Sequence, residues 1–274
     1  MNTIEKIMEV RANKGDFTTI NENDNLYETF KDFIKSNSKL LSNSIIVEGD
    51  IMKNYTFHIE DDSTFIQLLN VDDNQISQTI NVDGRLSIMP KVLATQIQIP
   101  YNVERLNLLK TEKELLERLL WKPFLKKIEK NIIAGDFFDK SLFNTSYEIT
   151  GTPDFNGLLS LARNIKNKTD NGCIVGNSAV ISSIIDTISK DAYLNEILLN
   201  NTIEGVEIIS TKESPALENG RILTAFDKNK ICLLLAEKFD TKKMSITGSA
   251  SDIYQFICFT NGGDMFDSAI ALKV

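Results

Sequence analysis

The longest regular hydrophobic pattern in the chain lies between residues 111 and 134. Leucine, isoleucine and phenylalanine recur there every three or four positions, which is typical of one face of an amphipathic helix. Thr111 and Glu114 form a capping-box pattern at the start, and Gly135 follows the end. The pattern therefore predicts a helix over 111–134, about 35 Å long at roughly 1.5 Å per residue. Pro123 removes one backbone hydrogen bond, so we expect a bend near the middle.

The first 43 residues are mostly polar and carry two short amphipathic stretches. In the second stretch the apolar side chains fall on one helical face: Leu26, Phe30, Phe33 and Ile34. This segment has too few apolar residues to form a core of its own. We expect it to pack on another surface, either within the chain or on a neighbouring copy.

Residues 44–85 alternate between apolar and polar positions in the manner of β-strands. From Glu48 to Arg85 there are eight acidic and two basic residues. Between two acidic runs lies an apolar patch: Phe65, Ile66, Leu68 and Leu69. The segment predicts a long two-stranded excursion with the patch near its far end. An exposed apolar patch usually marks an interaction site, so we expect an inter-subunit contact there. The alternative is that the patch folds back onto its own domain.

The pattern in residues 86–104 and 150–274 predicts further strands and helices. Residues 86–104 predict a strand, and Thr152-Pro153 predicts the start of a helix. Within 150–250 the pattern predicts an α/β unit of two helices and several short strands. Residues 251–274 predict two further strands around a turn at 261–264.

Composition narrows the possible functions. The chain has 274 residues, 42% of them hydrophobic, and a net charge of −8. It is ordinary globular composition, with no apolar stretch long enough to cross a membrane. An acidic chain is a poor nucleic-acid binder as a whole, because neutralising phosphates supplies most of that affinity. The three cysteines are widely spaced and indicate reduced, buried thiols.

Candidate chemistry is sparse. The sequence lacks the common nucleotide-binding, hydrolase and zinc motifs, and His58 is its single histidine. His58 and Glu60 share a face on a predicted strand, but two ligands are too few for a metal site. We therefore predict no enzyme activity, no cofactor and no metal. A small-molecule-binding α/β domain in 150–250 remains an alternative, although no glycine-rich phosphate loop supports it.

The order of these elements resembles the major capsid proteins of tailed bacteriophages, which have the Hong Kong 97-like fold that encapsulins share. Residues 86–95 resemble the strand that returns from the family's extended loop, and 111–135 resemble its spine helix. Residues 151–159, 177–194 and 205–217 are similar to the passages that follow in the family. The resemblance covers roughly 45–274.

The resemblance implies an α+β capsid fold with a defined division of the chain. It places an N-terminal arm in 1–43 and an extended β-hairpin, the E-loop, in 44–85. A peripheral domain with the spine helix 111–134 would comprise 86–149 and 251–274, and an axial α/β domain 150–250.

The implied function is a structural major capsid protein that self-assembles into an icosahedral shell around a double-stranded DNA genome. The implied partners are copies of the chain in hexamers and pentamers, a separate scaffolding protein, a portal, and DNA contacted non-specifically. A separate scaffold is expected because the E-loop begins within fifty residues of Met1. The implied location is the virion capsid, assembled in the bacterial host cytoplasm. An encapsulin-like nanocompartment shell protein is the alternative within the same fold.

Overall fold

The computed structural model describes residues 17–19, 25–49, 55–60, 82–100, 121–135, 137–138, 140–188, 198–199, 201–236, 240–245 and 251–274. These residues form a mixed α+β structure, which confirms the predicted fold class. Its helices are α2 (Asn25–Asn37), α5 (Lys122–Ile133), α6 (Phe155–Lys166) and α7 (Ser178–Ile188), with the 3-10 helices η2 (Leu142–Asn144) and η3 (Lys228–Lys230).

The first sheet is organised around one long strand, β14. On one side β14 pairs antiparallel with β13 and then with β12, and on the other side it pairs antiparallel with β5. β1 extends the sheet beyond β13, and β2 runs parallel to β12. The strands are β1 (Phe17–Thr19), β2 (Ile45–Gly49), β5 (Lys91–Pro100), β12 (Ile231–Ala236), β13 (Asp240–Ser245) and β14 (Ser251–Asp264).

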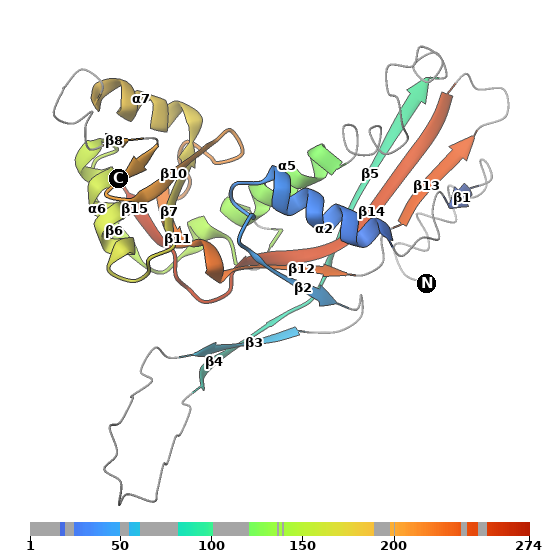
Figure 1. Ribbon diagram of the computed structural model, residues 1–274, viewed down its shortest axis with the longest axis horizontal. Helices are drawn as coiled ribbons and strands as arrows, with labels where there is room; N and C mark the ends of the chain where they lie inside the picture. Colours follow the sequence, from blue (N-terminus) through green and yellow to red (C-terminus); the bar gives the residue numbers. More distant parts are fainter. Residues whose placement is uncertain are drawn as a thin grey trace, which may run out of the picture.

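Helices α2 and α5 cover one face of this sheet (Figure 1). Aromatic rings join the three elements: Phe124 of α5 meets Phe256 of β14 edge-to-face, with ring centroids 4.5 Å apart. Phe30 and Phe33 of α2 each lie 5.4 Å from Trp121. Of the predicted apolar face, Phe30, Phe33 and Ile34 thus pack within the chain.

The second sheet has the order β6–β15–β11–β7–β10–β9–β8. Helices α6 and α7 pack on one face, against residues such as Ile174, Leu223 and Leu272. The other face, with Val175 and Phe226, packs into the core that α2 and α5 share. The strands are β6 (Glu148–Thr150), β7 (Gly172–Asn177), β8 (Leu198–Leu199), β9 (Thr202–Ile203), β10 (Val206–Thr211), β11 (Arg221–Asp227) and β15 (Ile270–Lys273).

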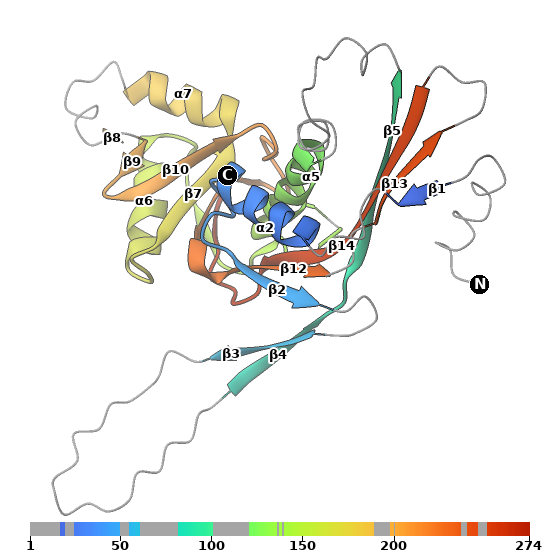
Figure 2. The same ribbon diagram turned by 45° about the vertical axis from the view of Figure 1, so that its right-hand side comes forward.

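A separate hairpin leaves the body of the protein. Strands β3 (Tyr55–Glu60) and β4 (Val82–Ile88) pair antiparallel with each other, and among the described strands with no other. Figures 1 and 2 show this pair projecting away from both sheets. The predicted excursion over 44–85 is wrong at its start, because Ile45–Gly49 pair with β12 in the first sheet, whereas Tyr55–Glu60 and Val82–Ile88 form a two-stranded hairpin with its root between β2 and β5.

The connection between the two sheets is unusually tight. Gly263 has φ of +135°, and a Cβ atom placed on it would lie 1.5 Å from the carbonyl oxygen of Lys140. The next residue, Asp264, accepts hydrogen bonds from the backbone N–H of Ala269 at 2.6 Å and the hydroxyl of Ser268 at 3.1 Å. These contacts fix the short path from β14 into β15.

Two local predictions were wrong. The turn expected at 261–264 is strand, because β14 continues to Asp264 and its glycines admit a close backbone approach. Helix α6 begins at Phe155 rather than directly after Thr152. Asp154 caps it by accepting from the N–H of Gly157 at 3.0 Å, and the hydroxyl of Thr152 donates to Asp154.

Within the predicted helix 111–134 the described helix is α5, which ends at Ile133, one residue before the predicted end. Residues 101–120 lie outside the described residues, so the bend expected at Pro123 stays a prediction. Gly135 has ordinary backbone geometry instead of the left-handed conformation of a typical helix stop. It is glycine because a Cβ there would meet the Asn131 side chain at 2.7 Å.

The two sheets do not correspond to two consecutive parts of the chain. Ile231–Ala236 and Asp240–Ser245 pair within the first sheet, whereas Ile270–Lys273 pair within the second. The domain limits expected from the sequence remain a prediction.

We predict that Gly263→Ala destabilises the chain far more than Gly205→Ala. Both glycines have positive φ, but a Cβ on Gly205 meets nothing within 4 Å. Gly205→Ala should therefore cost only the backbone strain, about 1–2 kcal/mol. Gly263→Ala adds a clash with a backbone carbonyl and should cost at least about 2 kcal/mol more. Urea unfolding of the unassembled chain, followed by circular dichroism, measures both. Equal costs would contradict the close approach to Lys140.

Candidate assembly surfaces

The described residues provide little that could hold a metal. No group of three or more histidine, cysteine, aspartate or glutamate side chains comes together among them. Cys173, Cys232 and Cys258 are buried and unpaired by disulfides. Desolvation raises the pKa of the Cys232 thiol to about 12, and it raises those of Cys173 and Cys258 as well. Such thiols stay protonated and are weak nucleophiles.

No described helix is long and apolar enough to cross a membrane.

The apolar patch predicted as an inter-subunit contact lies outside the described residues. Phe65, Ile66, Leu68 and Leu69 belong to the segment that connects β3 to β4. His58 and Glu60 lie on β3, whose backbone is described. The structure thus places the strands that carry the patch and leaves the contact itself a prediction.

A surface of exposed apolar side chains surrounds the root of the hairpin. Met89 is 49% exposed, Ile45 on β2 is 45% exposed, and Val92 on β5 is 36% exposed. Ile45 and Val92 alternate with Ile46 and Leu93, which face the core under α2 and α5, so both point to the opposite sheet face. Asn261 donates a hydrogen bond to the carbonyl oxygen of Met89 at 2.8 Å and fixes the junction between β4 and β5.

We call Ile45, Met89 and Val92 the root surface. Beneath it lies a small separate cluster: Ile88, Cys232, Leu234 and Met265, with Val47 and Phe266 packed against it. Sequence reasoning missed this surface, although the alternation in residues 91–98 already separates the two faces of β5. Exposed apolar side chains beside a projecting hairpin are suited to contact with another protein surface.

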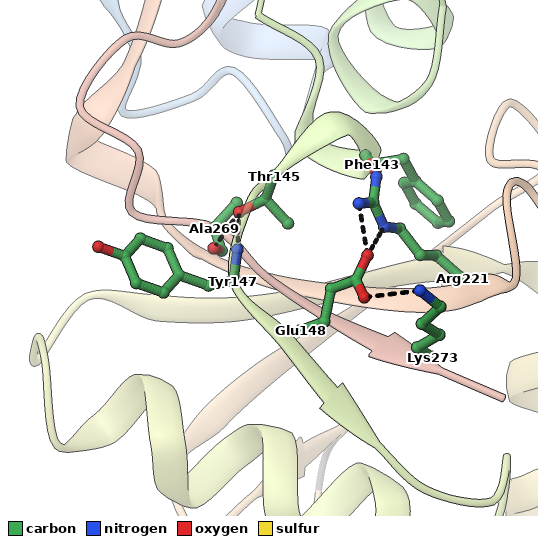
Figure 3. A network of polar contacts seen from close by, with 7 residues as sticks. All are labelled: Phe143, Thr145, Tyr147, Glu148, Arg221, Ala269 and Lys273. Carbon is green, nitrogen blue, oxygen red and sulfur yellow. Dashed lines mark hydrogen bonds and ion pairs between the residues drawn. The ribbon is translucent and has the colours of Figure 1, made fainter.

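A second feature is an ion-pair network at the edge of the second sheet (Figure 3). Glu148 on β6 accepts from the Nε of Arg221 at 2.8 Å with one carboxylate oxygen, and from the Nζ of Lys273 at 2.9 Å with the other. Arg221 also donates to the carbonyl oxygen of Phe143. The network joins the neighbouring elements η2 and β6 to β11 and β15, which lie more distantly in the sequence.

The network favours the ionised form of Glu148. Its pKa is lowered below the usual 4.5, first by the hydrogen bond from Lys273 and then by the one from Arg221. This edge strand is short and bears charged side chains, a common way of preventing uncontrolled strand pairing.

Exposed apolar residues also lie beside the network. Tyr147 is exposed, with the Nζ of Lys168 over its ring at 4.3 Å. Leu217 precedes a tight turn at Asn219 and Gly220, both with positive φ, as a two-residue hairpin turn requires. Sequence reasoning missed this region as well.

No family model matches the sequence, and no curated protein matches it. Solved structures do match. The satellite phage P4 procapsid that includes the size determination protein gives a TM-score of 0.65 at 9% identity, covering 99% of this chain and 96% of that one. The capsid of an empty GTA particle gives 0.61 at 12% identity, covering 85% and 88%.

The holo-SrpI encapsulin complex from Synechococcus elongatus gives a TM-score of 0.57 at 14% identity, covering 97% of this chain and 94% of that one. The chain therefore has the Hong Kong 97-like fold that phage capsid proteins and encapsulins share. The resemblance found in the sequence is confirmed at the level of the fold.

We predict that Glu148→Gln lowers the free energy of unfolding at neutral pH. Because the folded-state pKa of Glu148 lies below 4.5, its stabilisation is present above that pH and is lost as the pH falls through the folded value. Urea unfolding of wild type and variant at several pH values should show a difference at pH 7 that disappears in acid.

Glu218→Gln is the matched control, because Glu218 lies in the neighbouring turn and pairs with no cation among the described residues. It should leave the stability nearly unchanged at every pH. A pH-independent loss for Glu148→Gln would contradict the role of its charge.

Proposed function

We propose that the chain is the structural major capsid protein of a tailed bacteriophage. In this role it self-assembles into an icosahedral shell around double-stranded DNA. The observation that carries the proposal is the fold, which matches capsid proteins over most of this chain and most of theirs. The hairpin β3–β4, projecting from the body, supports it, because such an element needs a neighbouring surface.

Assembly is the activity that this arrangement serves. A shell protein acts by burying surface against copies of itself, and each apolar side chain removed from water contributes about 1.5–3 kcal/mol before ordering costs. The predicted contact of Phe65, Ile66, Leu68 and Leu69 and the root surface are the candidate surfaces on the hairpin side.

We base the division into domains, the partners and the absence of catalysis on the resemblance of the sequence to tailed-phage capsid proteins. Residues 1–43 act as the N-terminal arm and 44–85 as the E-loop. The peripheral domain comprises 86–149 and 251–274, and the axial domain 150–250. Copies form hexamers and pentamers in the host cytoplasm, with a separate scaffolding protein and a portal, and the chain performs no catalysis.

The alternative is an encapsulin-like shell that encloses a protein cargo. It is supported by the encapsulin match, whose coverage is 97% of this chain. Both functions use the same shell, so they differ in content rather than in fold. A small-molecule-binding α/β domain is less well supported, because the neighbours are shell proteins over nearly their whole length.

Electron microscopy of purified particles tests the proposal. We expect closed icosahedral shells, either from the chain alone or after co-expression with a scaffolding protein. Nuclease-protected double-stranded DNA inside particles from infected cells would support the capsid, and a co-purifying folded protein would support the encapsulin. A chain that stays monomeric at high concentration under both conditions would contradict both.

We predict that Leu68→Asp weakens or abolishes shell formation while the subunit keeps its circular dichroism spectrum. The new charge would oppose burial of the patch against a neighbour, since an unpaired buried charge is costly. Gln67→Asp adds the same charge at an adjacent polar position and should assemble normally. Normal particles from Leu68→Asp would rule out the contact, and an unfolded subunit would favour folding back.

A further inference from the structure

The outward face of α5 consists almost entirely of lysine. The buried side of this helix holds Phe124, Leu125 and Ile128, and the side chains fully exposed between residues 122 and 130 are Pro123 and four lysines. We call Lys122, Lys126, Lys127 and Lys130 the lysine face. Three of them recur every four residues, so they form one row about 12 Å long at roughly 1.5 Å per residue.

Among the described residues, none of the four lysines forms an ion pair, unlike Lys31, which pairs with Glu48. The acid on the helix, Glu129, lies on its flank and accepts from the hydroxyl of Ser38 at 2.6 Å. Burial raises the pKa of Glu129 and Glu213 acts in the same direction, whereas the Ser38 hydrogen bond and the charge of Lys126 lower it.

The neighbouring helix extends the same charge. α2 packs beside α5 through Phe30 and Trp121, and the exposed Lys35 and Lys39 lie at its end. Asp32 is an exposed acid on that helix. Among the described residues of this helical layer, six exposed lysines therefore stand against one exposed acid, although the chain as a whole carries −8.

A row of lysines without apolar side chains is poorly suited to protein contact. Protein–protein interfaces are depleted of lysine and have an apolar or aromatic centre, which this face lacks. Double-stranded DNA presents one negative charge per about 1.7 Å of axis and is held without sequence preference by exposed lysines. We infer that the lysine face binds the phosphate backbone of double-stranded DNA.

This inference rests on the proposed function and assigns residues to it. The net charge of the chain disfavours tight DNA binding, so the contact is weak for one subunit. In a shell, many copies present the same face, and weak contacts add up. The total charge does not reveal the face, because it averages over the whole chain, including the eight acidic residues between Glu48 and Arg85.

The test measures the binding of the unassembled full chain to a fluorescent double-stranded DNA of arbitrary sequence between about 50 and 200 mM salt. The variant changes Lys126, Lys127 and Lys130 together to glutamine, which has a helix propensity close to that of lysine. The matched control changes three exposed lysines near the second sheet to glutamine: Lys166, Lys168 and Lys212. Both variants lose the same charge.

For the lysine-face variant we expect the slope of log affinity against log salt to fall in magnitude by about 2.7, or about 0.9 for each lost contact. The control should keep nearly the wild-type slope. Equal slopes for the two variants, or no change in either, would overturn the inference. Such a result would not bear on the proposed function, because the binding assay does not measure shell formation.

Particle formation distinguishes the remaining outcomes. If the lysine-face variant stays folded and forms normal shells that retain less DNA, the inference is supported. If it loses shell formation while the control assembles, the face is a contact between copies, and the inference is overturned. If the wild-type chain forms no shells either alone or with a co-expressed scaffolding protein, the proposed function fails, whereas the salt slope still decides the inference.

Discussion

The structure depends on the backbone of one strand, β14, and on how it leaves the first sheet. β14 pairs with β5 on one side and with β13 and β12 on the other, so it holds that sheet together. At its end Gly263 lies against the Lys140 carbonyl, and Asp264 closes the short connection to β15. Both sheets therefore share a backbone path with little freedom, and the core under α2 and α5 is formed between them.

Sequence reasoning identified the elements whose pattern is local. The apolar face of Phe30, Phe33 and Ile34 predicted a helix, and α2 buries it. The end of α5 was predictable to within one residue, because it follows from periodicity within a short window. The strand predicted over 86–104 was wrong, because Val82–Ile88 pair with β3 and Lys91–Pro100 pair with β14. The ordered resemblance over the chain supplied the fold, which periodicity alone would not have given.

Features that depend on distant contacts were missed. Gly262 and Gly263 read as a turn in sequence, but their partners are Cys232 and Lys140, which no local pattern reveals. The same is true of the network of Glu148, whose cations come from β11 and β15. The root surface of Ile45, Met89 and Val92 required the sheet faces to be known, since exposure depends on what covers each face.

The parallel pairing of β2 with β12 has a consequence for synthesis. It matches Ile45 with Cys232, and β12 is held in turn by the C-terminal β14. Contacts between residues so distant in sequence form late, because a long loop must close first. A ribosome-bound chain cannot complete the first sheet before β14 has emerged, because β14 joins β5, β12 and β13. A nascent chain that has not yet reached β14 therefore lacks the framework from which the hairpin projects.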